Sequence, residues 1–452
     1  MMAINTKDMY LELQNKKESN AKSYPVRFPL VIEKAEGIMI TDVEGKVFYD
    51  CLSGAGTLAL GHNHQVVTQA IEDVVKQKIP LHTLDLATPL KIRFMQEIFT
   101  LLPEELREST KIHFCGPTGA DGVEAAIKLV KNATKGKSIL AFQGGYHGST
   151  QATMSMSGNL SKKQHLQSLL PDVHFLPFPY EYRCPFGVGD KQTAKLSAQY
   201  IENLLDDPES GIASPCGMIF ETVQGEGGAI PADIVWLKEM RRITAERGIP
   251  LIIDEVQTGI GRTGEMFSFE HAGIIPDVII CSKAIGGSLP MSIVIYKEEL
   301  DQWNPGAHIG TFRGNQLAMA TGLATLKYIK ENHILENVNA RSYQIFLGLS
   351  ALQEKYQEIG DVRGRGLMIG IEIVNPHGHK DRIGHYPQFE ELALTIQERC
   401  FENGLIIEVG GRHSAVMRFL PPLTITENET SEVLKVFEKS VMEAIQMIKV
   451  ND

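Results

Sequence analysis

Short apolar runs alternate with amphipathic segments from about residue 88 onward, and this alternation constrains the fold more than any other feature of the chain. The runs have the length of buried strands, and the segments between them have helical spacing. Such an order is typical of a mainly parallel sheet with helices on both faces. The expected strands are 112–115, 138–142, 173–176, 216–221, 251–254 and 277–281, and the expected helices are 90–102, 122–131, 194–205 and 234–246.

The two ends of the chain have a different texture. Residues 1 to about 35 are polar with weak periodicity and predict an arm, whereas 37–49 alternates around a turn and predicts a hairpin. Beyond about residue 330 the pattern predicts a smaller α+β unit. Its expected helices are 338–358, 389–403 and 427–445, and its expected strands are 405–408, 416–419 and the end of a glycine-rich stretch at 361–373.

Composition excludes several classes of function. The net charge of −11 argues against a nucleic-acid partner, which would require a basic face. The six cysteines form no CxxC pair and the histidines show no zinc-type spacing, so no metal site is expected. No run is long enough to span a membrane, and residues 1–20 lack the apolar core of a secretory signal. We therefore expect a cytoplasmic enzyme without a membrane partner.

Two of the expected strands end in residues that together suit one cofactor. Asp254 closes the run 251–254, and Lys283 follows the run 277–281. An amine that forms a Schiff base and an acid that holds a pyridinium nitrogen are what a pyridoxal phosphate (PLP) site needs. Because ligands bind at the carboxyl ends of the strands in such sheets, we expect both side chains in one site. Either residue alone would be read as a surface charge at a strand end.

Other candidate residues also follow expected strands or begin a helix. The turn at 118–122 feeds an amphipathic helix, whose N-terminus favours a phosphate. Tyr146 could stack on a flat ring, and His147 is expected to be a hydrogen-bonded structural histidine. Glu221 follows an apolar run, and Arg418 could bind a carboxylate through two nitrogens. Taken singly, these residues have equally ordinary readings as a helix start, a core aromatic or a surface charge.

Two blocks carry a resemblance to a known family. They are Asp-Glu-Val-Gln-Thr-Gly-Ile-Gly-Arg-Thr-Gly at 254–264 and Ser-Lys-Ala-Ile-Gly-Gly at 282–287. The chain resembles the class III (ω-amino acid) aminotransferases of PLP fold type I over nearly its whole length. That resemblance implies an α/β fold with a mainly parallel, seven-stranded-type sheet in a large domain, residues 61–330. It also implies a smaller α+β domain built from 1–60 and 331–452, PLP as cofactor, and a homodimer with a shared active site.

The same resemblance assigns roles to individual residues. Lys283 is implied to bind the cofactor as a Schiff base and to move the proton, and Asp254 to pair with the pyridine nitrogen. The other residues implied at the cofactor are Gly119 and Ala120 at the phosphate, Val256 and Tyr146 on the two ring faces, Gln257 at the ring oxygen, and Thr311 at the neighbouring subunit's phosphate. Arg418 resembles the arginine that binds the α-carboxylate of 2-oxoglutarate or glutamate. Glu221 resembles the gate that neutralises this arginine.

Within the class, the nearest likeness is to the diaminobutyrate–2-oxoglutarate transaminases, as in 53–64, 81–86 and 114–121. Relatives that act on 4-aminobutyrate carry arginine where Ser149 stands here. The implied reaction moves the 4-amino group of L-2,4-diaminobutanoate to 2-oxoglutarate and gives L-aspartate 4-semialdehyde and L-glutamate, reversibly. Another class III transaminase, acting on ornithine, acetylornithine, lysine or 4-aminobutyrate, stays open as an alternative, as does a PLP aminomutase.

Overall fold

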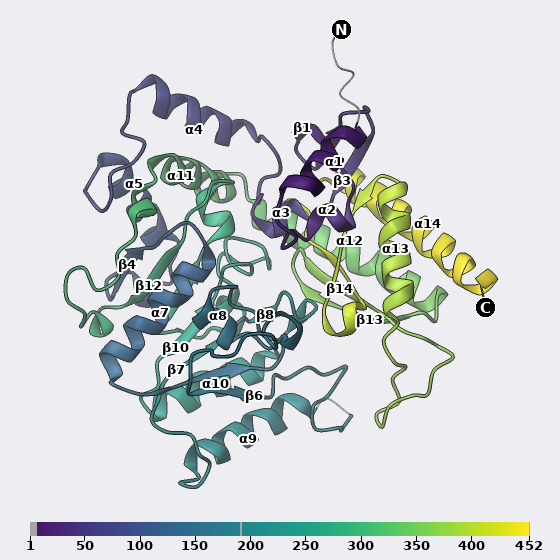
Figure 1. The fold of residues 1–452 in the computed structure, drawn as a ribbon. Helices are drawn as coiled ribbons and strands as arrows, with labels where there is room; N and C mark the ends of the chain where they lie inside the picture. Colours follow the sequence, from purple (N-terminus) through teal and green to yellow (C-terminus); the bar gives the residue numbers. More distant parts are fainter. Residues whose placement is uncertain (1–6, 190–191, 452) are drawn as a thin grey trace.

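The computed structural model describes residues 7–189 and 192–451 (Figure 1). Residues 1–6 of the expected arm lie outside these ranges. Segments from the two ends of the chain lie together on one side of the molecule, apart from the central sheet and its helices (Figure 1).

A seven-stranded sheet forms the centre of the larger part. Its strands, in spatial order, are β4 (Thr110–Phe114), β12 (Ile293–Lys297), β11 (Val278–Cys281), β10 (Leu251–Asp254), β7 (Pro215–Phe220), β5 (Ser138–Phe142) and β6 (Val173–Leu176). The strands from β11 to β6 pair in parallel, and β12 is antiparallel to both of its neighbours. The predicted mainly parallel sheet is therefore confirmed, although β12 was not predicted.

Helices cover both faces of this sheet because its strands are apolar on both sides. Leu140 packs in the core cluster that includes Trp236 of α10 (Ile234–Glu246), whereas Ile139 faces α7 (Gly119–Thr134). The other helices of this part are α4 (Gln65–Lys76), α5 (Pro89–Leu101), α6 (Glu104–Arg107), α8 (Gln151–Ser155), α9 (Thr193–Asp206) and α11 (Gln316–Glu331). Short elements complete it: β8 (Val223–Gln224), β9 (Ile230–Pro231), and the 3-10 turns η1 (Leu160–Lys162), η2 (Ser268–Ala272), η3 (Lys283–Gly286), η4 (Glu298–Leu300) and η5 (Thr311–Gly314).

Two smaller sheets join the ends of the chain. One has the order β1 (Ile32–Glu36), β2 (Met39–Asp42), β3 (Val47–Asp50) and β15 (Leu405–Ile406), and the other β13 (Ile359–Arg365), β14 (Met368–Ile373), β17 (Val416–Phe419) and β16 (Glu408–Gly410). The remaining elements are α1 (Lys7–Lys17), α2 (Tyr24–Arg27), α3 (Ser53–Gly56), α12 (Ile334–Lys355), α13 (Glu390–Glu402), α14 (Glu427–Asn451) and η6 (Arg412–Ser414). The pairing of β3 with β15 ties the N-terminal hairpin to the C-terminal part. The domain boundaries at 60 and 330 stay a prediction.

Three local expectations need correction. The stretch 361–373 is a two-stranded hairpin rather than a lead into one strand, because Gly366 turns the chain with φ +57°. The run 405–408 splits between two sheets as β15 and β16. The arm of residues 1–35 holds two helices, α1 and α2, and most of β1, which pairs with β2.

The described residues contain no helix that is both long and apolar enough to cross a membrane. Within the same ranges, no three His, Cys, Asp or Glu side chains are grouped so as to hold a metal ion.

Candidate active site

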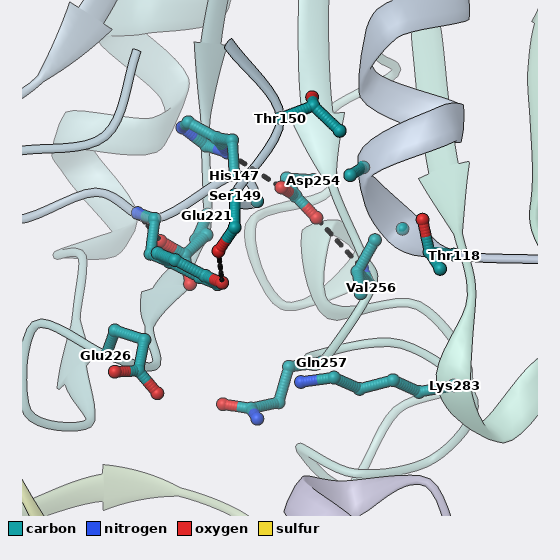
Figure 2. A pocket seen from close by; sticks show the side chains of 14 residues that line it. Thr118, His147, Ser149, Thr150, Glu221, Glu226, Asp254, Val256, Gln257 and Lys283 are labelled. Carbon is teal, nitrogen blue, oxygen red and sulfur yellow. Dashed lines mark hydrogen bonds and ion pairs between the residues drawn. The ribbon is translucent and has the colours of Figure 1, made fainter. Parts of the chain in front are cut away.

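A cavity of about 470 Å³ opens where β10 and β11 end (Figure 2). Among the residues that line it are eight of those predicted from the sequence: Gly119, Ala120, Tyr146, Glu221, Asp254, Val256, Gln257 and Lys283. They come from five different loops that follow β4, β5, β7, β10 and β11. The sheet therefore brings together residues that lie far apart in the sequence, as the parallel order predicts.

Lys283 presents a free amine to this cavity. Its backbone has φ +49°, a left-handed conformation that is uncommon for a residue with a side chain and typical of functional sites. Its Nζ makes no hydrogen bond or ion pair with any other described residue. Burial lowers the pKa of Lys283, although the charges of Glu226 and Asp254 oppose the shift. A lowered pKa favours the neutral, nucleophilic form of the amine.

Asp254 is buried and held from two sides. Its Oδ2 accepts a hydrogen bond from Nδ1 of His147 at 2.7 Å, and its Oδ1 accepts one from the Val256 amide at 3.1 Å (Figure 2). Burial by itself would lower the pKa of His147, but the hydrogen bond and charge of Asp254 outweigh it and raise the pKa. His147 thus orients Asp254 through this hydrogen bond, and the charge of Asp254 favours the protonated form of His147. The sequence indicated a hydrogen-bonded histidine but not its partner.

The start of α7 forms a cradle for an anion. Thr118 caps the helix by accepting a hydrogen bond from the Asp121 amide, and Oδ2 of Asp121 accepts one from the Thr118 amide. The amides of Gly119 and Ala120 make no hydrogen bond within the described residues, so both can donate to a bound group. A Cβ added at Gly119 would lie 2.8 Å from Cγ1 of Val256, so only glycine allows this close approach.

Tyr146 and Gln257 are each held in place by a neighbour. The Tyr146 hydroxyl lies 3.0 Å from Oγ of Ser149, and Nε2 of Gln257 donates to the Ala55 carbonyl at 2.9 Å. Both side chains are therefore fixed before any ligand binds, which lowers the entropic cost of binding.

The predicted pairing of Glu221 with Arg418 is wrong in this structure. Glu221 instead accepts hydrogen bonds from the amides of Tyr146, at 3.0 Å, and Gly225, at 2.8 Å. Burial and the nearby charge of Asp254 raise the pKa of Glu221 to about 7. Its carboxyl group accepts hydrogen bonds from the backbone and forms no ion pair with Arg418 among the described residues.

Glu226, five positions later in the same loop, is the acid that meets Arg418. Its Oε1 lies 3.0 Å from Nη2 of Arg418, which also lies 2.8 Å from Oε2 of Glu408. Arg418 holds the pKa of Glu226 down at about 2, against the effect of its burial. Arg418 is 2% exposed and does not line the cavity, whereas Glu226 does. The carboxylate therefore stands between the cavity and the guanidinium.

Thr311 also lies outside the cavity lining. It is exposed at the start of η5, and its carbonyl contacts the ring of His82. Its implied contact is with the phosphate of a neighbouring subunit, so its absence from this cavity leaves that prediction untested.

Comparisons with known proteins decide the family. The sequence profile described as "Aminotransferase class-III" matches residues 20–441. The chain belongs to the class III aminotransferases. This aminotransferase is 51% identical to the diaminobutyrate–2-oxoglutarate aminotransferase of Rhizobium meliloti (strain 1021), over 94% of this chain and 90% of the relative. It is 48% identical to the protein of that name in Haemophilus influenzae (strain ATCC 51907 / DSM 11121 / KW20 / Rd), over 97% of this chain and 96% of the relative.

A solved structure of an amine transaminase from an uncultivated Pseudomonas species, in its PLP-bound form, has the same fold. The TM-score is 0.84 at 24% identity, over 95% of this chain and 98% of the other. The predicted fold and family of this aminotransferase are thus confirmed.

The cofactor of this family is pyridoxal phosphate, and the donor set of the cavity fits it. An unpaired amine suits an aldehyde, a buried carboxylate suits a ring nitrogen, and two free amides at a helix N-terminus suit a phosphate. Lys283, Asp254 and the start of α7 are the groups that would hold it.

Proposed function

We propose that this aminotransferase moves the 4-amino group of L-2,4-diaminobutanoate to 2-oxoglutarate, giving L-aspartate 4-semialdehyde and L-glutamate. One observation carries the chemistry: an unpaired amine at Lys283 shares a cavity with the Asp254–His147 pair. The two relatives at 51% and 48% identity, both named for diaminobutyrate and 2-oxoglutarate, support the choice of substrates.

Each residue of the cavity has a separate role in this reaction. Bound pyridoxal phosphate supplies the aldehyde carbon that receives the amino group and the ring that accepts the electrons released at the substrate carbon. Lys283 would take the proton from the substrate carbon that bears the reacting amine. It would then deliver a proton to the cofactor carbon that receives the amino group. Asp254, oriented by His147, keeps a proton on the ring nitrogen. Val256 and Tyr146, which both line the cavity, would contact the two faces of the ring.

Glu226 and Arg418 adapt the site to two different substrates. When the diamine binds, its reacting end carries no carboxylate, and Glu226 together with Glu408 keeps the buried charge of Arg418 paired. When 2-oxoglutarate binds, its α-carboxylate displaces Glu226. Nε and Nη1 of Arg418 have no partner among the described residues, so the guanidinium has donors left for that carboxylate.

We expect two substitutions at this pair to affect opposite half-reactions. Arg418→Lys keeps the charge but loses the planar fork, and should slow the 2-oxoglutarate half-reaction about tenfold more than the diamine half-reaction. Glu226→Gln should slow the diamine half-reaction more, because it leaves Arg418 without this partner. Stopped-flow absorbance of the bound cofactor follows each half-reaction separately.

Glu221→Gln is the informative comparison for this switch. It removes charge from the same loop without touching Arg418, so it should not shift the balance between the two halves. A shift with Glu221→Gln, and none with Glu226→Gln, would return the role to Glu221.

We further propose a cytoplasmic homodimer in which Thr311 reaches the partner's cofactor. Exposed apolar side chains near Thr311, including Ile309, Phe312, Leu84 and Leu86, support a subunit interface on this face. Six unpaired cysteine thiols are compatible with a reducing compartment.

The reaction itself is tested by incubating the purified enzyme with L-2,4-diaminobutanoate and 2-oxoglutarate and measuring glutamate by chromatography. Ornithine, lysine and 4-aminobutyrate serve as competing donors at equal concentration. A clear preference for one of these donors, or amine migration without 2-oxoglutarate, would contradict the proposal and favour another transaminase or an aminomutase.

A further inference from the structure

One lysine that no motif singled out reaches the edge of the cavity. Lys162 ends η1, in the segment that follows α8, and its side chain is 47% exposed. Its Nζ lies 3.6 Å from Oε2 of Glu226 and 5.0 Å from the centre of the Tyr146 ring. Both of these partners line the cavity. Lys162 therefore places a positive charge at the cavity rim, away from the reacting lysine's own loop.

The two oxygens of Glu226 face two different cations. Oε1 pairs with the buried Arg418, whereas Oε2 faces the half-exposed Lys162. Lys162 contributes to the low pKa of Glu226 after Arg418. Ser149, which contacts the Tyr146 hydroxyl, offers a hydroxyl and no charge. Of the two cations that face Glu226, Lys162 is therefore the one that is accessible to a carboxylate at the rim.

Both proposed substrates bring a carboxylate to the same distance from the reaction. In L-2,4-diaminobutanoate the reacting carbon is C4 and the carboxyl carbon is C1. In 2-oxoglutarate the reacting carbon is C2 and the far carboxyl carbon is C5. Three carbon–carbon bonds separate the two positions in each molecule. A single fixed cation can therefore bind the far carboxylate of either substrate, while Arg418 is needed only for the near carboxylate of the oxo acid.

We propose that Lys162 binds this far carboxylate in both half-reactions and is a specificity-determining residue of the enzyme. When the far carboxylate binds Nζ of Lys162, that amine no longer pairs with Oε2 of Glu226. Oε2 can then accept a hydrogen bond from the α-ammonium group of the diamino acid. Lys162 and Glu226 then select the zwitterionic end of diaminobutanoate. The identity of the two carboxylate ligands rests on the proposed function above.

The test compares two donors that differ only by the carboxylate. 1,3-Diaminopropane is diaminobutanoate without its carboxyl group. Lys162→Met keeps the side chain as far as Cε and removes the charged amine. We expect kcat/KM for diaminobutanoate to fall about tenfold in this variant, mainly through KM, because one exposed charge-assisted contact is lost. The value for 1,3-diaminopropane should stay unchanged or rise.

Glutarate gives a second measurement that does not depend on turnover. It carries two carboxylates with the spacing of 2-oxoglutarate but has no reacting group. Calorimetric titration of the holoenzyme should show a Kd for glutarate that is about tenfold weaker in Lys162→Met. Lys330→Met is the matched control, because Lys330 is also about half exposed and lies 3.6 Å from a glutamate, Glu97, outside the cavity lining. It should change neither measurement.

Two results would overturn the inference. Equal losses with diaminobutanoate and 1,3-diaminopropane would make Lys162 a structural residue, and an unchanged glutarate affinity would show that it binds no far carboxylate. A wild-type enzyme that does not use diaminobutanoate would instead overturn the proposed function, and the glutarate titration would still decide the role of Lys162.

Discussion

Lys283→Ala should abolish turnover, with a loss of about 10⁴-fold or more in both half-reactions. The substitution removes the amine that the cavity presents without a partner, and with it the group placed to move the substrate proton. Alanine adds no charge and no further backbone strain, because the cost of φ +49° comes from Cβ, which lysine and alanine both carry. The variant should fold, and thermal unfolding followed by circular dichroism checks this.

A chemical label gives an independent measurement of the same assignment. Borohydride treatment of the wild-type holoenzyme should fix a phosphopyridoxyl group on the peptide that contains Lys283, and mass spectrometry locates it. Lys330→Ala should keep full activity, since this lysine pairs with Glu97 away from the site. A label on any other lysine would refute the role of Lys283.

Asp254→Asn is expected to slow the enzyme at least about 100-fold while leaving it folded. The amide keeps the size of the side chain but no longer favours a protonated ring nitrogen, and a lost charge-assisted contact of about 3 kcal/mol corresponds to roughly that factor. The pKa of His147 should also fall, because Asp254 is what raises it against the effect of burial. Single-turnover absorbance measures the rate, and NMR of the histidine ring measures the pKa.

His147→Gln separates charge from orientation in this pair. It keeps the carboxyl group of Asp254 but removes the ring that holds its Oδ2, so its effect should be smaller than that of Asp254→Asn. Single-turnover rates close to wild type in Asp254→Asn would show that the carboxylate is not needed for the reaction.

The sequence alone was enough to predict the mainly parallel sheet and the place of its two most informative residues. Strand length, helical spacing and capping residues such as Thr118 are local signals, and each can be read without knowing what packs against it. Asp254 ends one apolar strand and Lys283 follows its parallel neighbour, so the parallel order by itself brings them to one edge. The sequence pattern did not single out β12, and its antiparallel direction is set only by its pairing with β11 and β4.

Only the tertiary structure decided which acid pairs with Arg418 and which lysine lies at the rim of the active-site cavity. Glu221 and Glu226 lie in one glycine-rich loop, and nothing in their spacing says which of them faces β17. The choice depends on contacts made in the folded protein. The amides of Tyr146 and Gly225 donate hydrogen bonds to Glu221, whereas Glu226 forms the ion pair with Arg418. Lys162 likewise gains its place only when the segment after α8 folds across Tyr146. Periodicity encodes elements, whereas the direction of a loop side chain is set by the partners that folding brings to it.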